Sequence, residues 1–112
     1  MDLQLKGKNI LITGGSKGIG KAIAQVFLVE GANVAIAASD REILQKAKEE
    51  LGGNVVIYQA DITKAAEREN LIREFVQNQG KLDVLINNAG GSNGAGATET
   101  ELALFYEAME LN

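Results

Sequence analysis

Residues 13 to 20 read Thr-Gly-Gly-Ser-Lys-Gly-Ile-Gly, and their types and spacing suit the binding of a phosphate group. Glycine at positions 14, 18 and 20 lets a backbone turn tightly and approach a ligand without interference from a Cβ atom. The free N–H groups in the first turn of the following helix carry the positive end of its dipole, which favours an anion. The alternative is a tight turn that serves only to start a helix.

Other kinds of chemistry are restricted by the residue types that the 112 residues lack. The chain has no cysteine and no histidine, which excludes disulfides, thiolate or imidazole metal sites, cysteine nucleophiles and histidine-based triads. We therefore expect no metal site. Any reaction must use Ser, Thr, Tyr, Lys, Asn, Asp or Glu.

The charge pattern and the apolar runs restrict the partners. Acidic and basic residues are interspersed, the net charge is −4, and no basic patch indicates a nucleic-acid partner. The first residues do not have the pattern of a signal peptide, and no apolar run approaches the roughly 18 residues of a membrane span. These features predict a cytoplasmic protein with neither a nucleic-acid nor a membrane partner.

Apolar runs alternate with helical patterns along the whole chain and place the glycine turn between a strand and a helix. Uniformly apolar runs are typical of strands that are buried on both faces. We expect strands at 9–13, 33–38, 55–58 and 84–87, and helices from about 18, at 40–51, at 63–78 and from about 98. This alternation predicts one α/β domain with a doubly wound, Rossmann-like parallel sheet. In the strand order 3-2-1-4 the glycine turn lies at the switch point, where such proteins bind ligands.

Two finer patterns concern the helices. Ser39 and Glu42 have the spacing of a capping box, which predicts that Ser39 starts the second helix. Apolar residues at helical spacing follow the glycine turn and predict the apolar face of the first helix; they are Ala22, Ile23, Val26 and Phe27.

These residues resemble a known family, the short-chain dehydrogenases/reductases. Residues 13–20 are similar to the family's cofactor turn, and Asn-Asn-Ala-Gly at 87–90 is similar to its second signature after the fourth strand. Asp61 follows the third strand and Asn112 lies in the last helix, where the family has an adenine-binding Asp and a catalytic Asn. The four matches occur in the family's order and span the chain, which therefore resembles the first half of the family's fold.

The resemblance implies an NAD(P)-dependent oxidoreductase that interconverts a carbonyl and an alcohol. In the family, the glycine turn holds the pyrophosphate and the adenosine ribose, the end of the third strand contacts adenine, and the end of the fourth strand contacts the adenosine ribose. The cofactor-binding residues that this implies, in the same order, are Gly14, Ser16, Gly18, Ile19 and Gly20; Asp61 and Ile62; and Asn88, Ala89 and Gly90. Asn87 is expected to be structural.

These residues also have structural alternatives. Asp61 either accepts a hydrogen bond from the adenine amino group or simply leads into the cap of the third helix. Asn112 continues an apolar stripe, and by resemblance it is a catalytic residue that orders a water in a proton relay; the alternative is an ordinary C-terminal helix residue. The glycine-rich loop after position 90 is either functional or a plain flexible loop.

The end of the second strand bears on the choice of cofactor. Ala38 occupies the place of the acid that would bind both ribose hydroxyls of NAD, and Ser39 and Lys17 can both contact a 2′-phosphate. These residues favour NADP(H) over NAD(H). Asp40 complicates this prediction because it lies at about the generic distance for a ribose-binding acid, and Ser39 can equally be only a helix cap.

The family's catalytic Ser and its Tyr-x-x-x-Lys pair do not occur in these residues. The residue four positions after Tyr58 is Ile62, and the residue four positions after Tyr106 is Glu110, so neither tyrosine is followed by the required lysine. General acid–base help contributes about 10²–10⁴ in rate, so the 112 residues should be inert alone. We expect the dinucleotide-binding half of a longer reductase whose catalytic half is absent, acting on a small carbonyl or alcohol substrate. By resemblance, it is a homo-oligomer. The alternative is a noncatalytic half-domain that binds nucleotide or self-assembles to cover the edge of the fourth strand.

Overall fold

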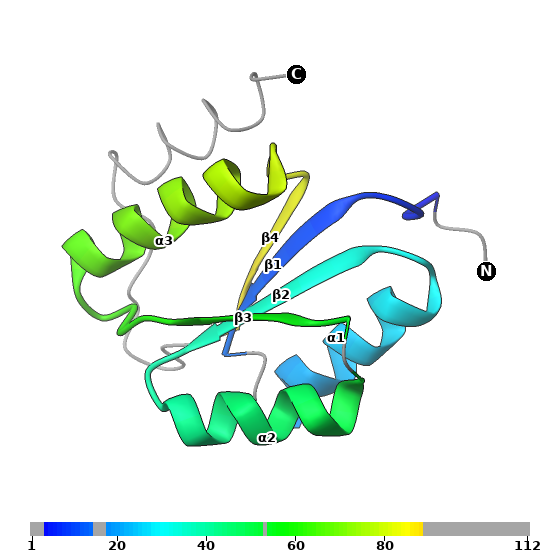
Figure 1. Cartoon of the computed structure of the whole chain (residues 1–112), viewed down its shortest axis with the longest axis horizontal. Helices are drawn as coiled ribbons and strands as arrows, with labels where there is room; N and C mark the ends of the chain where they lie inside the picture. The colour runs from blue at the N-terminus through cyan, green and yellow to red at the C-terminus, as the bar shows by residue number, and fades with distance from the viewer. Residues whose placement is uncertain (1–3, 15–17, 53, 89–112) are drawn as a thin grey trace.

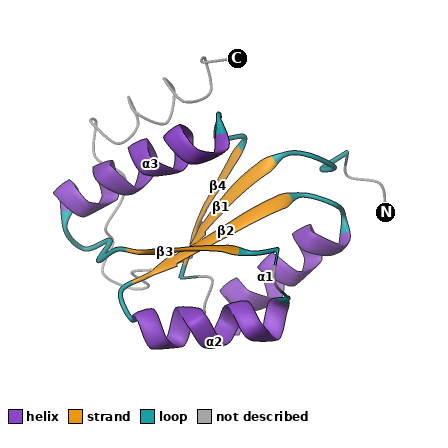
Figure 2. Cartoon of the chain, viewed as in Figure 1, coloured by secondary structure: helices purple, strands orange, loops and turns teal. Residues whose placement is uncertain are grey.

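The computed structural model describes residues 4–14, 18–52 and 54–88. The elements in this part of the chain are β1 (Asn9–Thr13), α1 (Gly18–Val29), β2 (Asn33–Ala38), α2 (Arg41–Leu51), β3 (Val56–Gln59), α3 (Ala65–Gln79) and β4 (Val84–Asn87). The strands form one parallel sheet in the order β3-β2-β1-β4 (Figures 1 and 2). This confirms the Rossmann-like α/β fold and the strand order 3-2-1-4. The last expected helix lies outside the described residues.

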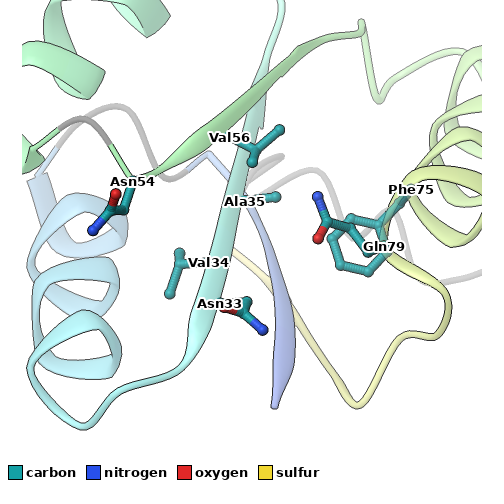
Figure 3. Close-up of a pocket in the computed structure, with 7 residues that line it drawn as sticks. All are labelled: Asn33, Val34, Ala35, Asn54, Val56, Phe75 and Gln79. Atoms are coloured by element: carbon teal, nitrogen blue, oxygen red, sulfur yellow. The ribbon is translucent and has the colours of Figure 1, made fainter. Parts of the chain in front are cut away.

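Helix α3 covers one face of the sheet, as Figure 2 shows. The residues that form this layer of the core are Leu11, Ala35, Ala37, Tyr58, Ala60, Leu71, Phe75 and Leu82. A cavity of about 80 Å³ remains beside β2 and α3, with Phe75 and Gln79 on its helix side (Figure 3). It begins at Asn33, the first residue of β2, so it lies toward the amino ends of the strands and away from the glycine turn.

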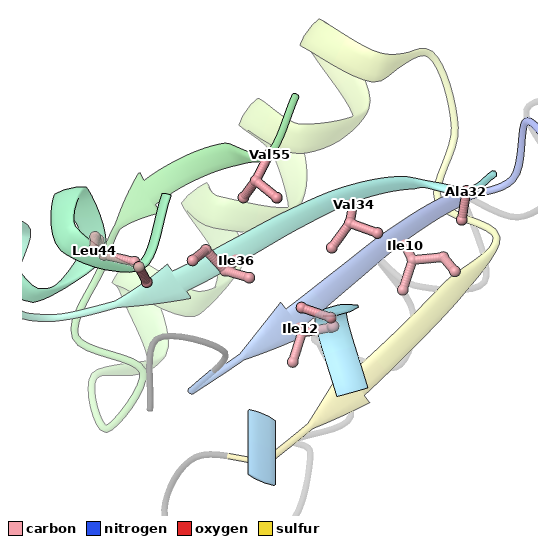
Figure 4. Packing of buried hydrophobic residues seen from close by; sticks show 9 residues of the cluster. Ile10, Ile12, Ala32, Val34, Ile36, Leu44 and Val55 are labelled. Atoms are coloured by element: carbon pink, nitrogen blue, oxygen red, sulfur yellow. The ribbon is translucent and has the colours of Figure 1, made fainter. Parts of the chain in front are cut away.

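Helices α1 and α2 cover the opposite face (Figure 1). The alternate residues of β1 and β2 point to this side, and the buried cluster consists of Ile10, Ile12, Ala24, Ala32, Val34, Ile36, Leu44, Ala47 and Val55 (Figure 4). Because each central strand supplies apolar residues to both layers, its sequence shows no polar alternation. This explains why uniformly apolar runs predicted the two central strands correctly, whereas the third strand, Val56–Gln59, lies one residue later than the predicted 55–58.

The packing of α1 differs from the prediction. The fully buried residues of α1 are small, Gly20 and Ala24, whereas Val26 is 55% exposed. Helical spacing alone indicates a stripe, and here small residues allow the helix backbone to approach the sheet, which turns Val26 outward. Of the four apolar residues expected on the inner face, Ile23 and Phe27 pack partly against the core and Ala22 is exposed.

The helix starts also differ by one or two residues from those expected. Asp40 caps α2, not Ser39: Asp40 Oδ1 accepts hydrogen bonds from the backbone N–H groups of Glu42 at 2.9 Å and Ile43 at 3.1 Å. Helix α3 begins at Ala65, not at Thr63, because the N–H and hydroxyl groups of Thr63 donate to Asp61. Both corrections fall in the segments that follow strands β2 and β3.

Asn9 joins the amino ends of β1 and β4. Its backbone N–H donates to Asp83 Oδ2 at 2.7 Å, and its side-chain amide donates to the carbonyl groups of Gln79 and Lys81 at 3.2 and 3.0 Å. These bonds fix where β4 begins against β1, so that Thr13 and Asn87 are partners at the other end. The bonds of Asn9 at the amino ends therefore help to set the register at the carboxyl ends.

Candidate functional site

The glycine turn leaves the carboxyl end of β1 at the centre of the sheet. The N–H of Gly14 donates to the carbonyl of Ala37 at 2.8 Å, so the first residue of the turn is attached to β2. Gly14 and Gly18 have φ values of +75° and +49°, in the region that favours glycine. Helix α1 begins at Gly18, and its N-terminus faces the end of the sheet. Residues Ser16 and Lys17 of the predicted site lie outside the described residues.

Gly20 joins this turn to the segment after β4. A Cβ atom at Gly20 would be impossibly close to the carbonyl oxygen of Gly14 and would lie 2.9 Å from Nδ2 of Asn88. The structure therefore brings Gly14, Gly20 and Asn88 together, although they lie up to 74 residues apart in the sequence. Only glycine fits at position 20 without moving one of the two segments. Ile19, beside it in α1, is 72% exposed.

The first Asn of the Asn87–Asn88 pair is held by the sheet. Thr13 Oγ1 donates to Asn87 Oδ1 at 2.9 Å, and the N–H of Asn88 donates to the carbonyl of Thr13 at 3.1 Å. The Asn87 amide is thus engaged by a neighbouring strand, whereas Asn88 is exposed beside the glycine turn. Ala89, Gly90 and Asn112 of the predicted site lie outside the described residues.

Ser39 follows β2 at the same edge of the sheet. It is exposed, and its hydroxyl makes no hydrogen bond with any described residue. Its carbonyl accepts a hydrogen bond of 3.0 Å from Nε2 of Gln59, the last residue of β3. The sequence did not predict this contact, because it depends on the parallel register that pairs Ala38 with Gln59.

Asp61 lies two residues beyond β3. Its Oδ1 accepts hydrogen bonds from Thr63, one from the backbone N–H at 3.0 Å and one from the side-chain hydroxyl. The Thr63 hydroxyl, followed by the Thr63 N–H and the charge of Lys64, lowers the pKa of Asp61 below its usual value. Asp61 is therefore an ionised acceptor at neutral pH, next to the partly buried Ile62.

The described part of the site offers binding groups and no reactive constellation. Tyr58 is buried under α3, on the face of the sheet opposite α1, and its hydroxyl accepts a hydrogen bond of 3.2 Å from Asn78. Within residues 4–14, 18–52 and 54–88 no group of His, Cys, Asp and Glu could hold a metal ion. In the same ranges, no helix has the length and apolar character needed to cross a bilayer. The binding groups lie at the carboxyl ends of the strands, and a helix N-terminus such as that of α1 favours an anion.

Residues 8–112 match the model of the short chain dehydrogenase family. The chain belongs to this family. The glycine turn, the Asp61 segment and Asn88 lie at one edge of a sheet, in agreement with the resemblance deduced from the same residues.

Relatives of known sequence extend well beyond this chain. The chain is 39% identical to hydroxynaphthalene reductase of Aspergillus fumigatus over 98% of its own length and 42% of that protein. It is 38% identical to a 3-oxoacyl-[acyl-carrier-protein] reductase of Chlamydia pneumoniae over 80% of its length and 38% of the relative. This chain thus spans about two fifths of the length of these relatives.

Solved structures of the family show the same arrangement. A short chain dehydrogenase from Bacillus anthracis, 38% identical, superposes with a TM-score of 0.72 over 78% of this chain and 36% of that one. A short chain dehydrogenase from Mycobacterium smegmatis, 36% identical, gives a TM-score of 0.72 over 77% of this chain and 38% of that one. Both fold and sequence therefore assign this chain to the family.

Proposed function

We propose that this chain is the dinucleotide-binding half of an NAD(P)-dependent oxidoreductase that interconverts a carbonyl and an alcohol. The observation that carries the proposal is the close packing of Gly20 against Gly14 and Asn88, which joins the glycine turn to the end of β4. Both named relatives are reductases, one of a hydroxynaphthalene and one of an oxoacyl group. Their names support reduction of a carbonyl as the direction of the reaction.

The open backbone at the start of α1 supports the proposal of a phosphate site. A Cβ atom built on Gly18 would meet no heavy atom of the described residues within 4 Å, so these residues leave the backbone at the start of α1 open on the side where a side chain would project. N–H groups at a helix N-terminus bind anions. The proposed contacts to pyrophosphate and ribose come from Gly14, Ser16, Gly18, Ile19 and Gly20 in the turn and from Asn88, Ala89 and Gly90 after β4.

The other end of the nucleotide would lie over the ends of β2 and β3. In this proposal Asp61 accepts a hydrogen bond from the adenine amino group and Ile62 packs beside the base. Ser39, with an exposed hydroxyl that no described residue engages, faces a ribose 2′-phosphate together with Lys17. Asp40 is engaged as the cap of α2, which supports NADP(H) over NAD(H).

In this proposal the complete reaction needs a protein that is longer than these 112 residues. The cofactor, when bound, supplies the hydride that passes to the carbonyl carbon. These 112 residues contain no Tyr-x-x-x-Lys sequence, so we propose that the acid–base residues lie in a catalytic half outside this chain. Asn112 would order a water for that half, and the protein would act as a cytoplasmic homo-oligomer on a small carbonyl or alcohol.

The choice of cofactor can be tested with Lys17. Loss of a charged contact to a phosphate typically costs about 1.5–3 kcal/mol, or about tenfold or more in affinity. Lys17→Ala should therefore raise the Kd of NADPH about tenfold and leave that of NADH nearly unchanged, as measured by isothermal titration. Lys46→Ala, at an exposed position of α2, is the matched control. Equal losses for the two cofactors would show that Lys17 does not read the 2′-phosphate.

A further inference from the structure

We propose that Glu67 and Arg68, neighbouring residues in the first turns of α3, are positioning residues that hold the Asp61–Ile62 segment in the conformation that reads adenine. The inference rests on the proposed function, because it assumes that Asp61 faces the base. Neither residue was singled out by the sequence analysis.

The two side chains make hydrogen bonds to the backbone at the two ends of the Asp61–Ile62 segment. Glu67 Oε1 accepts a hydrogen bond of 2.8 Å from the N–H of Asp61, and the guanidinium of Arg68 donates to the carbonyl of Ile62. These are the first N–H and the last carbonyl of the Asp61–Ile62 pair. The carboxylate of Glu67 accepts from an N–H group and the guanidinium of Arg68 donates to a carbonyl oxygen, so each contact is a charge-assisted hydrogen bond, which is stronger than a neutral one.

Further bonds fix the ends of the same segment. The N–H of Ala60 donates to the carbonyl of Ala38 at 2.9 Å, which attaches the segment to β2. The N–H of Lys64 donates to the carbonyl of Asp61 at 3.1 Å and closes the turn that leads into α3. Glu67 and Arg68 supply the restraint from the helix, between these two attachments. The segment is therefore held by a strand at one end and by helix side chains along its length.

This restraint decides where the Asp61 carboxylate points. Thr63 occupies Oδ1, while Oδ2 makes no hydrogen bond with any described residue. With the backbone and one oxygen fixed, the second oxygen keeps a single direction in which to accept a hydrogen bond. A carboxylate held in this way accepts from the 6-amino group of adenine and disfavours the 6-oxo group of hypoxanthine, because two acceptors would face each other.

The preference for adenine over hypoxanthine distinguishes positioning from a merely structural role. We would measure the Kd of 5′-AMP and of 5′-IMP for the protein by isothermal titration. The wild type should prefer AMP by about tenfold, the size of one hydrogen bond to a charged group. Glu67→Met and Arg68→Met should each reduce the ratio below about threefold, whereas Glu67→Gln, which keeps an acceptor, should preserve it. Glu74→Met, at an exposed position of α3, is the control.

The outcomes separate the inference from the proposed function. If the wild type and the Glu67→Gln variant prefer AMP and both methionine variants lose the preference, Glu67 and Arg68 position Asp61. If the methionine variants bind both nucleotides more weakly by the same factor, or keep the wild-type ratio, the positioning role is refuted while Asp61 as the adenine reader stands. Equal affinity of the wild type for AMP and IMP would refute the adenine role of Asp61 itself. Glu67 retains 43% side-chain exposure, so its replacement should leave the fold intact.

Discussion

The hydroxyl of Thr13, at the end of β1, donates a hydrogen bond of 2.9 Å to Oδ1 of Asn87, at the end of β4. The backbone of Asn88 continues the link by donating to the carbonyl of Thr13. The glycine turn begins immediately after Thr13, so this pair holds the two segments that flank the candidate site at a fixed separation.

Thr13→Val should weaken this link while preserving the shape of a side chain that is only 6% exposed. The loss of one hydrogen bond lowers the free energy of unfolding by about 0.5–1.5 kcal/mol. Nucleotide affinity should fall as well, because the Asn88 segment is less restrained. Urea unfolding and NADPH titration check both effects. Thr13→Ser keeps the hydroxyl and should keep the affinity; a Thr13→Val protein as stable as the wild type would contradict the role of this bond.

Gly20→Ala tests whether α1 packs closely against the glycine turn and the end of β4, because the contact determines whether the substitution raises or lowers the free energy of unfolding. In an ordinary helix interior this substitution stabilises by roughly 0.5–1 kcal/mol. Here the added Cβ would collide with the Gly14 carbonyl and press on Asn88, so the free energy of unfolding should instead fall by about 1–3 kcal/mol, as in other overpacked sites. Chemical denaturation measures the difference. A stabilised Gly20→Ala protein would mean that the turn and the β4 end are not in contact.

The lowered pKa of Asp61 predicts a pH dependence of stability. Its folded-state pKa lies below the usual 3.8, chiefly because of the Thr63 hydroxyl. The ionised carboxylate therefore stabilises the fold at pH values above the usual pKa of 3.8, and this stabilisation is lost as the pH falls through the lower folded pKa. The difference in Tm between the wild type and Asp61→Asn should be constant from about pH 7 to 5 and shrink in more acidic solution. A difference that widens on acidification would show that the pKa is raised instead.

The sequence predicted the sheet because each central strand is apolar on both faces and each is followed by a turn or a helix start. It also located the glycine turn and the positions of Asn88, which directly follows β4, and of Asp61, which lies two residues beyond β3. The predicted cap of α2 was wrong because Ser39 and Asp40 are adjacent and both residue types suit a cap. In the structure the carbonyl of Ser39 accepts a hydrogen bond from Gln59, and the carboxylate of Asp40 accepts from the first turn of α2.

Contacts between segments were harder to foresee. The Asp61–Glu67 bond depends on a turn that returns the chain to its own backbone after six residues, a conformation that helical or strand periodicity does not encode. The exposure of Val26 was also not predicted, because helical spacing does not show which of two neighbouring stripes on a helix faces the sheet. Small residues, Gly20 and Ala24, mark the inner face here, and only packing against the sheet shows it.

The central claim, that the glycine turn binds the dinucleotide, is tested most directly by titrating NADPH into the wild type, Gly18→Ala and Gly7→Ala and following the fluorescence of the nucleotide. Gly18 and Gly7 have φ values of +49° and +78°, and an added Cβ at either position meets no heavy atom within 4 Å in the part of the chain that the structure describes. Both variants therefore carry a similar backbone strain of about 1–2 kcal/mol. Only Gly18 lies in the turn. We expect saturable binding by the wild type and by Gly7→Ala, and a Kd at least about tenfold higher for Gly18→Ala because its methyl group enters the phosphate site. A folded Gly18→Ala protein that binds NADPH as tightly as Gly7→Ala would contradict the account.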